Sequence, residues 1–331
     1  MGLTTVALGL LGVVSFVQTA HWRNNETLLA QGLTVNPDSV VARHNRGHLL
    51  AVQGKHTEAV EQFRATLRDH PDHVELYLSL GSSLVALHQV DGAVDVMREA
   101  AGRFSSEPLV YCQLGIVLAR QGAKEEAERA YRRALELDGD CVGAHLDLGS
   151  VLMGRGEVEA AVEHYRRVLE VAPNHVAARL SLGAALRLLG RMDEARHHYR
   201  AALETDPRSA AAHYNLGILL AEEGALDEAV EHYRTALRFD PGHARAHVNL
   251  GIVLFEQGKT PEAMEHFRRA LTIEPELAQA HLHLGCALAA EGHDAEAEEE
   301  LRAALRLVPP DSEMARQIRR LLQPYEDGEM P

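Results

Sequence analysis

Apolar positions along most of the chain recur at intervals of three and four, and the whole pattern starts again at a fixed longer interval. Within residues 212–241, one apolar run is centred on residues 216–220 and a second covers residues 229–237. Intervals of three and four place apolar side chains on one face of an α-helix. Each long interval therefore predicts two amphipathic helices, and the chain is predicted to be all-α.

Eight glycines mark the repeat, each 34 residues after the one before. They are Gly47, Gly81, Gly115, Gly149, Gly183, Gly217, Gly251 and Gly285. An alanine follows each glycine after twelve residues, from Ala59 in the first interval to Ala297 in the last. Glycine inside a helix costs roughly 1 kcal/mol relative to alanine. We therefore expect a facing helix to approach each glycine closely, with the alanine as its small partner.

A second series of glycines separates the two helices of each interval. Its members are Gly54, Gly122, Gly156, Gly190, Gly224, Gly258 and Gly292, and His88 takes this position in the second interval. Proline, which cannot continue a helix, follows the second helix in most intervals, as at Pro207 and Pro241. A single helix pair cannot bury its apolar faces, so the array is expected to be stabilised by stacking of neighbouring pairs.

This spacing of glycine, alanine and turn glycine resembles the tetratricopeptide repeat (TPR) family over residues 40–311. The resemblance implies an all-α, superhelical TPR solenoid of eight helix-turn-helix repeats of 34 residues each. An apolar face after the last repeat predicts a C-terminal capping helix over residues 312–323, with Ser312 as its N-cap. Residues 324–331 are expected to be disordered.

The N-terminal segment has a different character, because residues 2–20 carry no charge over 19 positions. At about 1.5 Å per residue, such a helix nearly spans the hydrocarbon core of a bilayer. We therefore predict a transmembrane helix over residues 1–20. A signal peptide is disfavoured because the stretch lacks a basic start and ends in a poor cleavage site. A buried apolar helix that caps the solenoid remains the alternative.

Residues 21–39 are predicted to be a degenerate half-repeat, because Pro37 lies 34 residues before Pro71. Here Trp22, Glu26 and Pro37 resemble the junction between membrane segment and repeats in the transmembrane-and-TPR glycosyltransferase-like group. That resemblance implies that the TPR array lies outside the cytoplasm. It also implies that the catalytic residues of that group would lie in upstream membrane loops, so this chain is not expected to be an enzyme.

Composition and motifs exclude several kinds of chemistry. The formal net charge of −15 argues against binding to nucleic acid or anionic lipid. Three scattered cysteines imply neither a disulfide framework nor a zinc site. No phosphate-binding loop, nucleophile elbow or pair of catalytic carboxylates stands out, so no catalytic residue and no cofactor are predicted.

Histidine is abundant, with 20 residues, but its placement follows the repeat. One position holds His145, His213, His247 and His281, and another holds His164, His198, His232 and His266. Repetition in register indicates a structural role in the scaffold. Although His243 and His247 have the i, i+4 spacing of metal ligands, no repeated third ligand accompanies them, so no metal site is predicted.

Polar residues stand two positions before each repeat glycine. They are Asn45, Ser79, Gln113, Asp147, Ser181, Asn215, Asn249 and His283. The TPR resemblance places this position on the inner, concave surface and implies that the asparagines hold the backbone of a bound peptide. A small polar residue is equally expected on a merely solvated helix face. The basic clamp of chaperone-binding TPR domains would need lysines at these positions, and none is present.

Apolar residues are expected to edge this polar series. The residues three before each glycine are His44, Leu78, Cys112, Leu146, Leu180, Tyr214, Val248 and Leu282, and Ile116, Ile218, Ile252 and Phe255 follow the glycines. Together they would form a groove suited to an extended or helical peptide segment. The predicted peptide-binding residues are Asn45, Gln113, Asp147, Ser181, Tyr214, Asn215, Ile218, Asn249, Ile252, Phe255 and His283.

An arginine also recurs once in every interval, always at the same distance after the repeat glycine. The series is Arg64, Arg98, Arg132, Arg166, Arg200, Arg234, Arg268 and Arg302. Each has a carboxylate three or four residues away on the same predicted helix, as Glu163 is to Arg166. Such pairs contribute about 0.2 to 0.5 kcal/mol each and neutralise the series. We therefore interpret it as a solvated face rather than an anion site.

Two functional hypotheses follow from these patterns. The first is a membrane-tethered TPR scaffold whose concave groove binds an extended or helical peptide segment. The alternative is that the chain is the C-terminal, substrate-presenting TPR region of a polytopic membrane O-glycosyltransferase-like protein.

Overall fold

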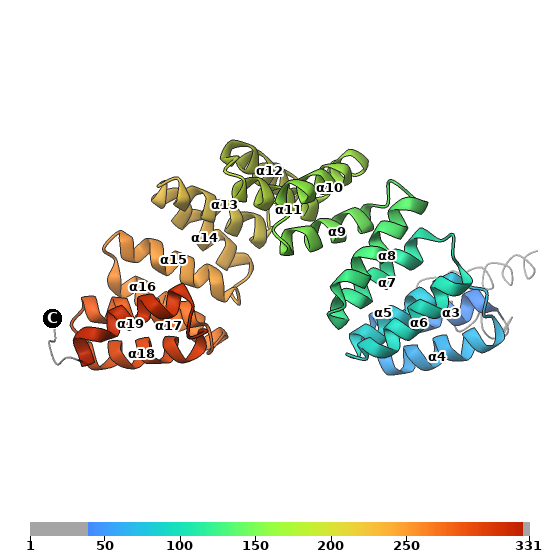
Figure 1. Cartoon of the computed structure of the whole chain (residues 1–331), viewed down its shortest axis with the longest axis horizontal. Coiled ribbons are helices and arrows are strands. Elements are labelled where there is room, and N and C mark those ends of the chain that lie inside the picture. The colour runs from blue at the N-terminus through green and yellow to red at the C-terminus, as the bar shows by residue number, and fades with distance from the viewer. Residues whose placement is uncertain (1–38, 327–331) are drawn as a thin grey trace, which may run out of the picture. The chain divides into compact units, whose positions relative to one another are not determined.

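The computed structural model describes residues 39–326, which form seventeen α-helices and no strand (Figure 1). The helices fall into two compact units that meet in sequence after Gly154. In the first unit the helices are α3 (Val40–Val52), α4 (His56–Asp69), α5 (Val74–Ala86), α6 (Val90–Arg103), α7 (Pro108–Gln121), α8 (Lys124–Leu137) and α9 (Val142–Gly154).

The second unit contains ten helices. They are α10 (Val158–Val171), α11 (Val176–Leu188), α12 (Met192–Thr205), α13 (Ala210–Glu222), α14 (Leu226–Phe239), α15 (Ala244–Glu256), α16 (Thr260–Ile273), α17 (Ala278–Ala290), α18 (Asp294–Leu307) and α19 (Glu313–Glu326). Odd-numbered helices from α3 to α17 are the first helices of the repeats, and even-numbered helices from α4 to α18 are the second helices. Within each unit, consecutive helices pack together and first helices also contact the next first helix.

The repeat glycines lie where the two helices of a repeat meet. A Cβ atom added to Gly217 would be 2.7 Å from Cε1 of Tyr233, and one added to Gly251 would be 2.5 Å from Cε1 of Phe267. Real Cβ atoms do not approach other atoms this closely. The predicted close approach of the helices is therefore confirmed.

The side chain nearest each glycine is not that of the predicted alanine but lies one helical turn beyond it, although at Gly285 the carbonyl oxygen of Ala297 also lies 3.2 Å from the added Cβ. The partners are Phe63, Met97, Tyr131, Tyr199, Tyr233, Phe267 and Leu301, over Gly47, Gly81, Gly115, Gly183, Gly217, Gly251 and Gly285. Ala229, the alanine expected to face Gly217, is fully buried but precedes Tyr233 by that turn. A large side chain on the second helix thus lies over the bare backbone of the first.

The turn glycines adopt a backbone conformation that other residues avoid. Gly54, Gly122 and Gly224 have φ angles of 78°, 90° and 79°. His88, which replaces glycine in the second interval, has φ 59° and is the one non-glycine residue with positive φ in the described part of the chain. The tight turn therefore imposes a left-handed residue whatever the side chain.

Helix α19 covers the apolar end of the second unit. Its residues Ile318 and Leu322 are buried against Leu282, Leu301 and Ala304. The Ser312 hydroxyl oxygen accepts the backbone N–H of Ala315 at 3.1 Å, which confirms the predicted N-cap.

The predicted end of this last helix is wrong by three residues. Residues 324–326, expected to be disordered, are helical, and Tyr325 packs against the same apolar cluster. Pro324 lies in the final turn of this helix, so the backbone hydrogen bond that it cannot donate is lost near the helix end.

The remaining predictions about the termini fall outside the described residues. These are the transmembrane helix over residues 1–20, most of the half-repeat over residues 21–39, and the tail after Glu326. Across residues 39–326, every helix is too short or too polar to cross a lipid bilayer.

The glycine contact yields a stability prediction. Gly217→Ala should lower the free energy of unfolding by roughly 1 to 3 kcal/mol, because the added methyl group overpacks against the Tyr233 ring. Gly102→Ala is the matched control, since Gly102 lies in α6 and its added Cβ would meet no atom within 4 Å. The control should leave stability unchanged or raise it by up to about 1 kcal/mol. The free energy of unfolding is measured by urea unfolding followed by circular dichroism. Equal stability of Gly217→Ala and Gly102→Ala would contradict this packing.

The turn conformation yields a second prediction. His88→Gly should stabilise the chain by roughly 1 kcal/mol, because glycine adopts positive φ without steric cost. Gly224→Ala, the opposite change at the same repeat position, should destabilise it by a similar amount. Both variants are compared with the parent by their urea midpoints. No gain from His88→Gly would show that the turn is not strained.

Candidate functional site

The first helices of the second unit present the predicted peptide-binding residues on one face. Helices α11, α13, α15 and α17 contact one another in order. We call the following residues the first-helix face: Ser181, Tyr214, Asn215, Ile218, Asn249, Ile252, Phe255 and His283. All eight are partly exposed. Spacings of three and four residues, as between Asn215 and Ile218, keep them on the same side of their helices.

A hydrogen bond joins two neighbouring helices across this face. Nδ2 of Asn249 on α15 donates to the hydroxyl oxygen of Tyr214 on α13 at 3.2 Å. The Tyr214 ring also lies 4.5 Å from the ring of His243, centroid to centroid. Burial raises the pKa of Tyr214, so its hydroxyl stays protonated at neutral pH. The Asn249 amide is therefore already engaged within the fold.

Asn215 differs from Asn249 although both occupy the same repeat position. Within residues 39–326 its side chain has no hydrogen-bond partner. An amide offers both donor and acceptor groups, which match those of a peptide backbone. Asn215 is thus available to a ligand, whereas Asn249 also serves to hold Tyr214.

His283, at the end of this face, is a packing residue. Its ring stacks on Phe267 with centroids 5.8 Å apart and an interplanar angle of 21°. Burial lowers the pKa of His283, so the ring is neutral at pH 7. The residue as a whole is partly exposed.

The first unit carries the other three predicted residues. Asn45 is exposed on α3, and Nε2 of Gln113 on α7 donates to the Ser82 hydroxyl at 3.3 Å. Asp147 on α9 is half-buried, and this burial raises its pKa. His44 contacts the hydroxyl of Ser79 at 2.9 Å, in the repeat register of Tyr214 and Asn249. Side-chain hydrogen bonds between successive first helices therefore recur in both units.

Part of the predicted apolar edge is wrong. Cys112, Val248 and Leu282 are 7%, 1% and 3% exposed and do not line the surface. Leu282 belongs to the cluster under α19, and Cys112 packs against Cys141. Burial raises the pKa of the Cys112 thiol to about 12, so it is an unreactive apolar side chain.

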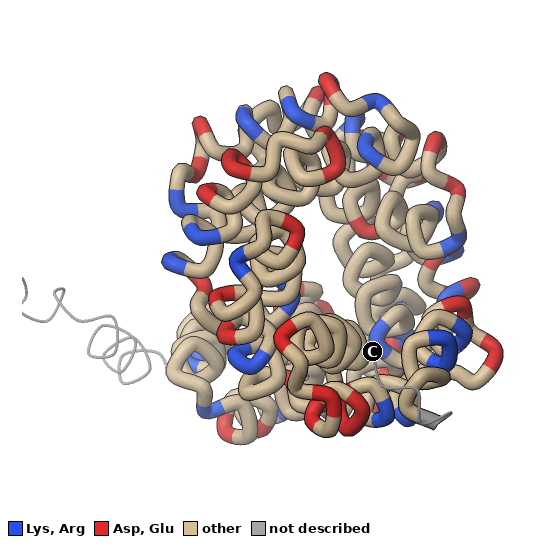
Figure 2. Tube along the Cα trace, turned by 90° about the vertical axis from the view of Figure 1, so that its left-hand side faces the viewer, with Lys and Arg blue, Asp and Glu red and all other residues tan. Residues whose placement is uncertain are grey.

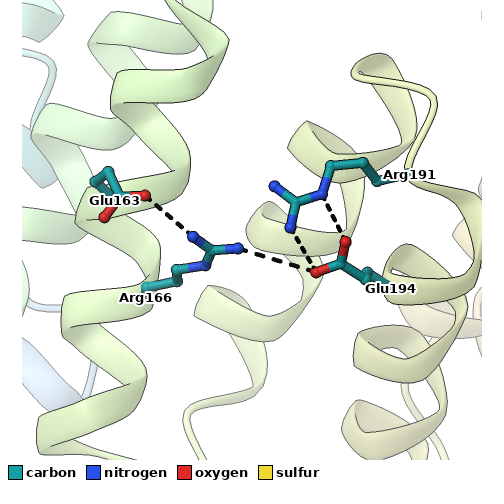
Figure 3. A network of polar contacts seen from close by, with 4 residues as sticks. All are labelled: Glu163, Arg166, Arg191 and Glu194. Atoms are coloured by element: carbon teal, nitrogen blue, oxygen red, sulfur yellow. Dashed lines mark hydrogen bonds and ion pairs between the residues drawn. The ribbon is translucent and has the colours of Figure 1, made fainter.

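The arginine series links successive second helices, which the local spacing did not indicate. Arg166 on α10 contacts Glu163 on its own helix at 3.1 Å and Glu194 on α12 at 3.9 Å (Figure 3). Arg191 donates two hydrogen bonds to the same Glu194, at 2.6 and 2.7 Å. These bonds lower the pKa of Glu194. Charges of both signs are interspersed along the described helices, as Figure 2 shows.

The expected local pairs form at only some arginines. Arg166 and Arg234 pair with Glu163 and Glu231 as predicted. Arg132 and Arg302 also pair with a carboxylate four residues away on the same helix, Glu128 and Glu298, whereas Arg98 pairs with Glu126 on α8. Among the described residues, Arg64, Arg200 and Arg268 have no carboxylate partner. The interpretation as a neutralised face therefore holds for part of the series only.

The two histidine positions face each other across the helix pair. Nδ1 of His213 lies 3.0 Å from Nδ1 of His232, and Nδ1 of His247 lies 3.0 Å from Nδ1 of His266. Nε2 of His213 also contacts the carbonyl oxygen of Pro207 at 3.3 Å. Because a carbonyl only accepts, Nε2 carries the proton and Nδ1 of His213 accepts from His232. Each neutral pair is thus a directed hydrogen bond.

The eighth repeat replaces the second histidine by a carboxylate. Nδ1 of His281 lies 2.5 Å from Oε2 of Glu300, at the place of the histidine pairs. Burial, followed by the neighbouring histidine, lowers the pKa of His232 and of His247, and burial lowers that of His266. Residues 39–326 contain no group of three side chains suited to hold a metal ion.

Comparison with known families gives matches over most of the array. The model of the cilia and flagella-associated protein 70 C-terminal domain matches residues 97–321, and a tetratricopeptide repeat model matches residues 44–108. Tetratricopeptide repeat protein 7A of Homo sapiens is 31% identical over 123 residues, which cover 37% of this chain and 14% of that protein.

A second curated protein and a solved structure are also similar. Protein O-mannosyl-transferase Tmtc3 of Drosophila melanogaster is 25% identical over 141 residues, covering 38% of this chain and 15% of that protein. The matched region is thus about one seventh of either curated relative. A chain of the APC/C hetero-tetramer Cut9-Hcn1 has a TM-score of 0.67 at 16% identity, covering 87% of this chain and 57% of that one. This last likeness shows the fold alone.

The histidine pairs generate a prediction of pH dependence. The pKa of these histidines is lower in the folded chain than in the unfolded chain, so as the pH falls the unfolded chain takes up protons before the folded chain does. Their contribution to the free energy of unfolding is therefore fully present above about pH 6.5 and is lost as the pH drops below it. The variant His232→Gln/His266→Gln should lose less stability between about pH 7.5 and 5.5 than the parent, by about 1 kcal/mol. Urea titrations at each pH provide the measurement. Parallel pH curves for variant and parent would rule out this role.

Proposed function

Since the chain belongs to the tetratricopeptide repeat family, we propose that it is a non-catalytic scaffold that binds a polypeptide segment on its first-helix face. The observation that carries the proposal is the state of Asn215, whose amide has no partner among residues 39–326 although its repeat equivalent Asn249 is hydrogen-bonded. The N–H and C=O groups of a peptide backbone could serve as the hydrogen-bond partners that the Asn215 amide lacks.

Apolar side chains beside this amide support a peptide ligand over a small polar one. Ile218 lies one turn from Asn215, and Ile252 and Phe255 lie on the adjacent helix α15, all partly exposed. Peptide recognition combines main-chain hydrogen bonds with apolar contacts to alternate side chains. The first-helix face offers both within two neighbouring helices.

We further propose that residues 2–20 tether the scaffold to a membrane, with the repeats outside the cytoplasm. The uncharged run of 19 residues supports the tether. The resemblance of the junction around Trp22 to membrane-bound TPR proteins supports the orientation. Deleting residues 2–20 should release the chain from carbonate-washed membranes, and release of the intact chain under the same wash would count against the tether.

The second candidate function is presentation of substrate by the TPR region of a polytopic O-glycosyltransferase-like protein. The similarity to Protein O-mannosyl-transferase Tmtc3 favours it. The repeats would then bind the acceptor polypeptide, while catalysis would belong to membrane segments upstream of this chain. Both candidates use the same face and the same ligand class, and they differ in whether further hydrophobic spans are joined upstream of Met1.

Peptides selected from a random phage-displayed library on the immobilised chain provide the test of peptide binding. Asn215→Ala combined with Asn249→Ala should weaken the selected peptide about tenfold, because hydrogen bonds to the ligand backbone are lost. Helicity should not change, as both residues are partly exposed. Asn174→Ala, an exposed asparagine outside this face, is the matched control. Failure to enrich any peptide, or equal affinity of the double variant and the control, would refute the site.

A further inference from the structure

A pocket in the first unit lies outside the first-helix face. It has a volume of about 640 Å³ and lies between the second helices α4 and α6, over α5. Arg64 and Arg68 on α4 and Arg103 on α6 line it, together with Tyr77 and Leu80 on α5. We call this the arginine pocket. Tyr77 and Leu80 are each 2% exposed, so tightly packed side chains of α5 close the bottom of the pocket.

The charges that line the arginine pocket are not balanced. Oε1 of Glu99 accepts hydrogen bonds from the Tyr77 hydroxyl at 3.0 Å and from Nε of Arg103 at 3.2 Å. Glu99 thus compensates Arg103 and is fixed by Tyr77. Within the described part of the chain, Arg64 and Arg68 have neither an ion pair nor a hydrogen bond from their side chains. Two guanidinium groups therefore remain uncompensated in a protein with a net charge of −15.

Three equivalent grooves elsewhere contain a carboxylate from the chain itself. Three arginines at the repeat position of Arg64 reach the third residue of the following second helix. These contacts are Arg98 to Glu126 at 2.9 Å, Arg166 to Glu194 at 3.9 Å, and Arg234 to Glu262 at 3.6 Å. In α6 the third residue is Gly92, which has no side chain. Arg64 in the arginine pocket therefore lacks the carboxylate that its repeat equivalents contact.

We propose that the arginine pocket is a binding site for an acidic peptide segment, whose carboxylate takes the place that a glutamate of the chain fills beside Arg98, Arg166 and Arg234. The internal contacts show that a carboxylate fits beside an arginine in this groove. Guanidinium groups bind carboxylates with charge-assisted hydrogen bonds. An apolar side chain next to the acidic residue would cover Val96, which is partly exposed. The site is independent of peptide binding at the first-helix face, because the two share no residue.

The test uses the full chain in a neutral detergent and a fluorescent peptide, Leu-Glu-Glu-Ile-Asp-Leu, followed by anisotropy at about 50 mM salt. Arg64→Gln/Arg68→Gln should weaken binding at least roughly tenfold, because both uncompensated charges are removed. Gly92→Glu should do the same by restoring the internal carboxylate. An added Cβ at Gly92 meets Leu84 only at 4.0 Å, so this variant should fold normally.

Matched controls separate the pocket from general electrostatic attraction. Gly92→Gln adds a side chain of the same size without charge and should keep the affinity within about twofold. Arg268→Gln removes another arginine that has no carboxylate partner in the described region, and it should also keep the affinity. Circular dichroism of each variant checks the fold.

The proposal would be overturned by full affinity in Arg64→Gln/Arg68→Gln, by an equal loss in Arg268→Gln, or by equal binding of the amide peptide Leu-Gln-Gln-Ile-Asn-Leu. Binding of inorganic phosphate without binding of the acidic peptide would also overturn it, because the pocket would then be a phosphoryl site. If Asn215→Ala lost the library-selected peptide but still bound the acidic peptide, the result would concern only the first-helix face and not the arginine pocket.

Discussion

The structure depends on one contact, in which a large side chain of the second helix lies over the glycine of the first. Wherever this contact is described, a Cβ on the glycine would lie 3.0 Å or less from the covering side chain, whether that is an aromatic ring, Met97 or Leu301. The absent side chain lets the helix axes approach, and the ring fills the space at normal packing density. Because the contact is described in seven of the repeats, their helix pairs share one internal geometry, and neighbouring pairs can stack by the same rule.

Repetition of geometry lets one repeat position carry different chemistry in different repeats. The position of His232 and His266 holds Glu300 in the eighth repeat, so a neutral histidine pair becomes a contact between imidazole and carboxylate. The position of Glu194 holds Gly92 in the second repeat, and within residues 39–326 Arg64, the repeat equivalent of Arg166, has no carboxylate partner. The scaffold tolerates both changes because the backbone is set by the glycine contact rather than by these polar side chains.

The two proposed binding surfaces differ in how they compensate their polar groups. On the first-helix face, Asn249 bonds to Tyr214 while Asn215 offers a neutral amide beside apolar side chains. In the arginine pocket, Glu99 pairs with only one of the three guanidinium groups, so positive charge remains unpaired. A neutral amide suits the backbone of many peptides, whereas uncompensated charge selects a particular side chain. The chain could therefore hold a general and a specific ligand at separate places.

Periodicity by itself determined the all-α class, the helix pairs, the turn glycines and the N-cap at Ser312, because these depend on residues within a few positions of one another. It also placed Asn215, Ile218 and Asn249 on first helices, since spacing within a helix fixes its faces. Only the tertiary structure decided which side chain covers each glycine, which carboxylate reaches each arginine, and that Val248 and Leu282 are buried. Those outcomes depend on the docking of separate helices, where the partners come from different helices and often from different repeats. A local pattern does not encode the rotation of one helix against another, so the arginine pocket and the histidine pairs became visible only in three dimensions.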